Sequence, residues 1–161
     1  MAAAPALAPV LMPDTRVFVH PGKLAASATP CRITTILGSC VAVSLHDAGM
    51  GVGGINHYLL PRAPHGEAST RFGDHALPQL LEAVERLGAR RKHLVAKVVG
   101  GACVLDAFRD KTTHLGNQNV TMAFETLHEM RLPVMMAETG GSKARHVTFH
   151  PHTGDLVVRS L

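Results

Sequence analysis

The stretch from Leu37 to Pro61 constrains the fold of this chain more than any other part of its sequence. Two apolar, β-prone runs flank Asp47-Ala48-Gly49-Met50, a combination typical of a turn between antiparallel strands. A two-residue loop at Ala48-Gly49 would place Cys40 directly opposite His57. Directly opposed residues have Cβ atoms roughly 4.5–5.5 Å apart, so the sequence predicts a thiol facing an imidazole.

A thiol and an imidazole at that distance predict an activated cysteine nucleophile. Each group favours the charged form of the other, so the Cys40 pKa should fall below its usual value of about 8.5 and the His57 pKa should rise. The alternative is a small buried cysteine beside an ordinary histidine. The same pairing places small residues on the Cys40 face and bulky ones on the opposite, core-like face: Ala42, Ser44, Gly51 and Gly53 against Val41, Val43, Leu45, Met50 and Val52.

Two further groups near Cys40 are candidates for the same chemistry. Gly38-Ser39 suits a tight turn that leaves backbone N–H groups free near the sulfur, where they could hold an oxyanion. Thr34 and Thr35 lie on the preceding strand. A hydroxyl from either could orient the histidine ring, and the residues alone do not choose between them.

The amino-acid composition is typical of one globular domain with an aliphatic core. Of 161 residues, 46% are hydrophobic but only 4% aromatic, so Val, Leu, Ile and Ala must fill the interior. The net charge of +4 is mild and its cations are scattered, which argues against a nucleic-acid surface. Three cysteines are no disulfide framework and fit a reducing, cytoplasmic compartment. No apolar run is long enough to insert in a membrane.

The order of elements predicts an α+β fold. Helical periodicity marks residues 74–87 and about 117–131, and strands are expected at 16–19, 31–37, 94–99, 133–137, 145–150 and 156–158, besides the hairpin. Most strands are joined by hairpins, so we expect a single-domain α/β sandwich with mainly antiparallel strands and two main helices on the sheet faces. Residues 1–14, rich in Ala and Pro, are expected to be a disordered N-terminal extension to a domain over 15–161.

The eleven histidines do not form a recognisable metal motif. His146, His150 and His152 lie close together, but Pro151 disturbs their alternation, and neither HExxH nor a Cys–His zinc spacing occurs. We therefore expect neither a metal nor another cofactor.

Several segments together resemble the chemoreceptor glutamine deamidases of the CheD family. These are Thr35 to Val43, Gly54 to Pro61, Ala96 to Ala102, Gly116 to Val120, Gly140 to Phe149, and Thr153-Gly154. They span nearly everything after the N-terminal extension.

This resemblance implies an α/β sandwich fold and a catalytic deamidase domain over 15–161. It implies hydrolysis of glutamine side chains on methyl-accepting chemotaxis receptors through a thioester, with Cys40 as nucleophile, His57 as its histidine and Thr34 as the third member. It also allows a CheC-type phosphatase as a partner. The alternatives are a binding module that docks on receptor or phosphatase without turnover, and a cysteine peptidase.

Overall fold

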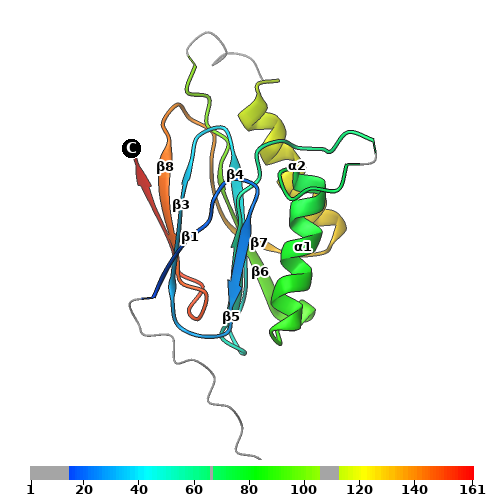
Figure 1. The fold of residues 1–161 in the computed structure, drawn as a ribbon, viewed down its shortest axis with the longest axis vertical. Coiled ribbons are helices and arrows are strands. Elements are labelled where there is room, and N and C mark those ends of the chain that lie inside the picture. Colours follow the sequence, from blue (N-terminus) through cyan, green and yellow to red (C-terminus); the bar gives the residue numbers. More distant parts are fainter. Residues whose placement is uncertain (1–14, 66, 106–112) are drawn as a thin grey trace, which may run out of the picture.

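The computed structural model describes residues 15–65, 67–105 and 113–161, and the predicted extension over residues 1–14 lies outside them. The regular elements, in chain order, are β1 (Arg16–Phe18), β2 (Leu24–Ser27), β3 (Arg32–Leu37), β4 (Val41–Asp47), β5 (Val52–Asn56), α1 (Gly73–Arg86), a 3-10 turn (Arg91–His93), β6 (Leu94–Gly100), α2 (Leu115–Glu129), β7 (Val134–Thr139), β8 (Arg145–Phe149) and β9 (Leu156–Ser160) (Figure 1).

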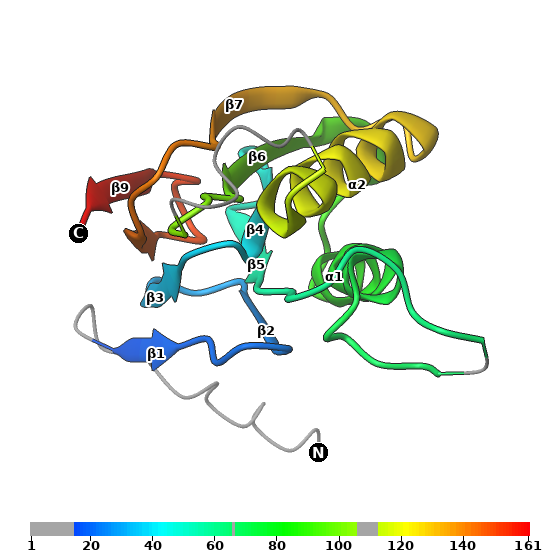
Figure 2. The ribbon, with the colours of Figure 1, turned by 90° about the horizontal axis from the view of Figure 1, so that it is seen from above.

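The described elements form three layers. One sheet has the order β1-β3-β8-β9 and the other β2-β5-β4-β6-β7, with parallel pairing only at β1–β3 and β6–β7 among the described strands. Both helices lie on the same side of the five-stranded sheet, and the four-stranded sheet lies on its other side (Figure 2). The predicted α+β sandwich of mainly antiparallel strands is confirmed, with the helices on one face of one sheet.

Two hydrophobic layers hold this arrangement together. Aliphatic residues of β4, β6, α1 and α2 pack between the helices and the five-stranded sheet. A second layer, which includes Ile33, Ala42, Val99 and Phe149, fills the space between the two sheets. Every residue of β4 is buried because both of its faces are covered.

Helix α1 follows the predicted periodicity closely. Leu77, Leu80, Leu81 and Val84 of α1 are buried on one face, as amphipathic spacing requires. The strand β2 was not predicted, because its sequence Leu-Ala-Ala-Ser lacks the β-branched and aromatic residues that favour strands.

The hairpin differs from the predicted one in its register. Asp47 pairs with Val52, so the turn contains the four residues 48–51 instead of two. The buried Asp47 carboxylate accepts hydrogen bonds from the backbone N–H groups of Gly49 and Met50 and forms an ion pair with Arg90. These contacts stabilise the longer turn. The predicted direct opposition of Cys40 and His57 is therefore wrong. A shift of two residues leaves the side chains of the paired strands on their predicted faces. Met50, predicted for the core-like face, instead lies in the turn and is 49% exposed.

Candidate active site

Cys40 and His57 are diagonal neighbours on one face of the five-stranded sheet. Val41 pairs with Tyr58 through two backbone hydrogen bonds, which continues the hairpin register beyond Ser44 and Ile55. Ala42 consequently lies opposite His57, with Cys40 one diagonal step away. Such diagonal residues lie roughly 7–8 Å apart at Cα, still within reach of long or aromatic side chains.

The ring of His57 is oriented by a threonine of the opposite sheet. The Thr35 hydroxyl donates to the carbonyl of Val19 at 2.7 Å and lies 2.7 Å from His57 Nδ1. Because its single hydrogen is used on Val19, this hydroxyl must accept a hydrogen from Nδ1. Nε2 then carries the free lone pair, and it is buried without a hydrogen-bond partner among the described residues. His57 Nε2 is therefore an unprotonated nitrogen that can accept a proton, and it lies on the sheet face that carries Cys40.

Thr34, the third member implied by the family resemblance, points the other way. Alternate strand residues face opposite sides, and Thr35 shares its side with buried Ile33 and Leu37. Thr34 is half-buried on the outer side, together with exposed Ile36. The alternation of apolar and polar residues along β3 was the sequence signal that could have selected Thr35 over Thr34.

The resting pair is neutral, in contrast to the predicted ion pair. Burial lowers the pKa of His57 to about 4, against a smaller opposing effect of the Val19 carbonyl. Burial also raises the pKa of Cys40, although its own backbone N–H acts in the opposite direction. Desolvation disfavours both charged forms, and it is the largest effect on each of the two pKa values. A neutral thiol acting as a nucleophile would have to give up its proton as it attacks, and the neutral imidazole could accept it.

The backbone at Cys40 is held by three hydrogen bonds to successive carbonyls. Gly38 C=O accepts from Ala102 N–H at 3.0 Å, and Cys40 C=O accepts from Gly101 N–H at 2.9 Å. Ser39 C=O accepts from the side chain of Asn119 at 3.0 Å. Among the described residues, neither the N–H of Ser39 nor the N–H of Cys40 donates a hydrogen bond to an oxygen or nitrogen atom. The predicted loop candidates Gly38 and Ser39 thus lie in a segment with fixed carbonyls.

Asn119 reaches this segment because α2 packs unusually close to the end of β6. Gly101 and Gly116 touch so closely that a Cβ on either would collide with the backbone of the other. Asn119 follows Gly116 by almost one helical turn and therefore faces the same side. Sequence reasoning missed this residue, although a polar side chain between Gly116 and Met122 on the buried face of a helix was a usable signal.

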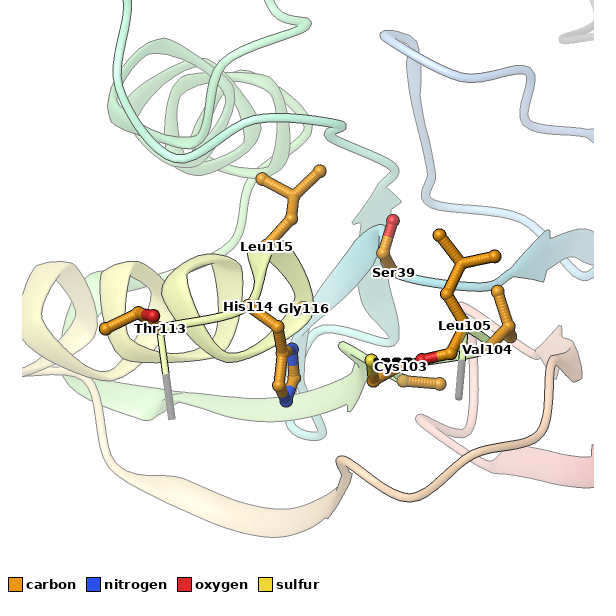
Figure 3. Close-up of a pocket in the computed structure, with 9 residues that line it drawn as sticks. Ser39, Cys103, Val104, Leu105, Thr113, His114, Leu115 and Gly116 are labelled. Atoms are coloured by element: carbon orange, nitrogen blue, oxygen red, sulfur yellow. Dashed lines mark hydrogen bonds between the residues drawn. The ribbon is translucent and has the colours of Figure 1, made fainter. Parts of the chain in front are cut away.

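A pocket of about 400 Å³ opens beside Ser39, the residue before Cys40. Figure 3 shows its walls, with Ser39 on one side, Cys103 to Leu105 after β6 on another, and His114 and Leu115 at the start of α2. Val104 and Leu105 are exposed apolar residues. The pocket can therefore accept apolar groups beside Ser39.

The other two cysteines are more enclosed than Cys40. Cys31 is 3% exposed and Cys103 is 7% exposed, whereas Cys40 is half-buried. In the described ranges, no group of three His, Cys, Asp or Glu side chains could hold a metal ion. The helices described also include none that could cross a membrane.

Comparison with known proteins identifies the family of the chain. The profile of a family described as "CheD chemotactic sensory transduction" matches residues 59–160. The chain is 51% identical to the probable chemoreceptor glutamine deamidase CheD 1 of Anaeromyxobacter dehalogenans, over 91% of this chain and 85% of the relative. It is 42% identical to the probable chemoreceptor glutamine deamidase CheD of Rhodospirillum rubrum, over 89% and 81%. Its identity to the protein of that name from Trichlorobacter lovleyi is 41%, over 91% of both chains. This chain therefore belongs to the CheD family.

Proposed function

We propose that this protein hydrolyses glutamine side chains of chemoreceptors to glutamate, with Cys40 as nucleophile and His57 as the group that moves protons. The names of the relatives, probable chemoreceptor glutamine deamidases, support the substrate class and the reaction. The observation that carries the residue assignment is the chain from Val19 C=O through the Thr35 hydroxyl to His57 Nδ1, which leaves Nε2 free.

The first half of the reaction forms a thioester. Cys40 Sγ attacks the carboxamide carbon while its proton passes to His57 Nε2. The carbonyl oxygen becomes an oxyanion, and the backbone N–H groups of Ser39 and Cys40 are the donors that would stabilise it. His57 then returns the proton to the leaving nitrogen, and the C–N bond breaks to release ammonia.

The second half regenerates the thiol. Water attacks the thioester carbonyl and gives one proton to His57 Nε2, and the same N–H groups hold the new oxyanion. Collapse of this intermediate breaks the C–S bond, releases the glutamate side chain and returns the proton to Cys40. The net reaction consumes one carboxamide and one water, and it yields one carboxylic acid and one ammonia.

Thr35 replaces Thr34 as the orienting residue in this proposal. Its hydroxyl keeps the Nδ1–H tautomer, as the third group of a catalytic triad does, and it carries no charge that would stabilise an imidazolium. The low His57 pKa is consistent with this arrangement. Catalysis therefore uses a neutral base, and no metal or other cofactor has a place in these steps.

Two further parts of the proposal rest on the family resemblance. They are a CheC-type phosphatase as a second partner and a cytoplasmic location, where the signalling parts of chemoreceptors lie.

Intact-mass analysis of a receptor cytoplasmic fragment incubated with the protein tests the reaction. Deamidation replaces an NH₂ by an OH, so each modified glutamine should show the corresponding small mass gain, and Cys40→Ala should abolish it. Chain cleavage would identify a peptidase instead. Stable binding without any mass change would favour the non-catalytic adaptor.

A further inference from the structure

The side chain of Asn119 on α2 makes an uncommon pair of contacts. Its Nδ2 group donates to Ser39 C=O at 3.0 Å and to Leu59 C=O at 2.9 Å. The two carbonyls belong to the segments that carry Cys40 and His57. Asn119 thus bridges both halves of the candidate site from a helix that follows Leu59 by 60 residues and Ser39 by 80.

Stability alone does not account for an asparagine at this position. The residue is 0% exposed, and its Oδ1 is buried without a partner among the described residues. An unpaired buried acceptor costs free energy. Buried polar groups that lack a hydrogen-bond partner, and so cost stability, are typical of functional sites.

The contact with Ser39 has a geometric consequence for the nucleophile. In a trans peptide unit the C=O and N–H bonds point in opposite directions. The C=O of Ser39 and the N–H of Cys40 belong to one unit, so holding the carbonyl toward Asn119 directs the N–H away from it. The neighbouring unit is held in the same way by the Ala102 main chain. Of the three hydrogen bonds to the carbonyls of residues 38–40, the one from Asn119 is made by a side chain. A mutation can therefore remove it without changing the main chain.

We propose that Asn119 is a positioning residue that aims the Cys40 backbone N–H at the oxyanion of the transition state. This inference rests on the proposed deamidation. Asn119 does not touch the substrate, because its side-chain polar atoms face carbonyls or protein interior. Its effect should fall on the chemical step and leave both substrate binding and the thiol itself largely unchanged.

The test compares Asn119→Ala with Tyr58→Phe. Tyr58 donates its hydroxyl to the backbone carbonyl of Asn119, so the control removes another buried hydrogen bond at the same residue without releasing Ser39. Deamidation of the receptor fragment gives kcat and KM, iodoacetamide gives the alkylation rate of Cys40, and thermal unfolding gives Tm. Alkylation requires the thiol but no oxyanion.

For Asn119→Ala we expect kcat to fall by about 10- to 100-fold, below the roughly 10²–10³ that follows removal of an oxyanion donor. KM and the alkylation rate should remain within about threefold, since neither depends on the oxyanion. Tyr58→Phe should lower Tm but keep kcat. Asn119→Asp preserves the shape of the side chain but offers at most one hydrogen to the two carbonyls, so it should lose kcat too, and it decides the question if the alanine variant does not fold.

An unchanged kcat in the Asn119 variants, with an active wild type, would overturn this inference and leave the proposed function standing. A parallel loss of kcat and alkylation in the Asn119 variants, at a Tm matching that of Tyr58→Phe, would assign Asn119 a structural role only. A wild-type protein that leaves the receptor fragment unmodified would refute both the function and the inference.

Discussion

Replacing Thr35 by valine tests the assignment of the orienting threonine. Valine has nearly the same shape but no hydroxyl, so His57 Nδ1–H and Val19 C=O would both lose their partner in the space between the sheets. Each buried polar group left unpaired costs about 1–3 kcal/mol. For the two groups together we expect the free energy of unfolding to fall by about 2–6 kcal/mol, compared with a total of about 5–15 kcal/mol for a typical domain.

The same substitution should affect turnover more than binding. Without the Thr35 hydroxyl the ring of His57 can turn or change tautomer, and misplacement of a reacting group by about 1 Å can cost about 100-fold in rate. We expect kcat for deamidation of a receptor fragment to fall by about 10- to 100-fold, with little change in KM.

Thr34→Val is the matched control for Thr35→Val. It makes the same chemical change one residue earlier, on the outer side of β3, where the Thr34 hydroxyl makes no hydrogen bond within the described part of the chain. Its unfolding free energy should stay within about 0.5 kcal/mol of wild type and its kcat should be unchanged. Loss of turnover in Thr34→Val together with full turnover in Thr35→Val would refute this reasoning.

The remaining predictions concern the thiol, the imidazole and metals. Cys40→Ala should abolish deamidation while Cys31→Ala and Cys103→Ala retain most of it; an active Cys40→Ala protein would contradict the mechanism. His57 has a pKa of about 4 when folded and about 6.5 when unfolded, so stability should be lost as the pH falls from about 6.5 to 4, by up to about 3 kcal/mol. Urea unfolding should show this loss in wild type and a smaller one in His57→Gln, and equal losses would refute the assignment. Exhaustive chelation should leave activity intact; restoration of a lost activity by zinc would reverse that view.

The sequence alone was sufficient for the face of each strand in the hairpin. Period-two alternation depends only on the chain being extended, so the prediction that Val41, Val43 and Leu45 face a core did not depend on the register. Both helices were recognisable for a similar reason, since a 3.6-residue apolar period is a local property of the chain.

The observed register is supported by a contact distant in sequence. Arg90 completes the set of donors around the Asp47 carboxylate, and this set favours the four-residue turn. Local turn chemistry could not show that an arginine 43 residues away would be present. The shift moved Cys40 and His57 from direct to diagonal neighbours.

The proposed nucleophile Cys40, the proposed base His57 and the glycine-serine segment before Cys40 were candidates from the sequence alone, because they lie close together along the chain. Thr35, Asn119 and the neutral state of the pair depend on the tertiary structure. Thr35 meets His57 because one sheet packs on the other, and Asn119 meets Ser39 because two glycines let α2 approach β6. The same packing removes water from Cys40 and His57, and desolvation is a property of the folded interior that no spacing of residues along a chain can express.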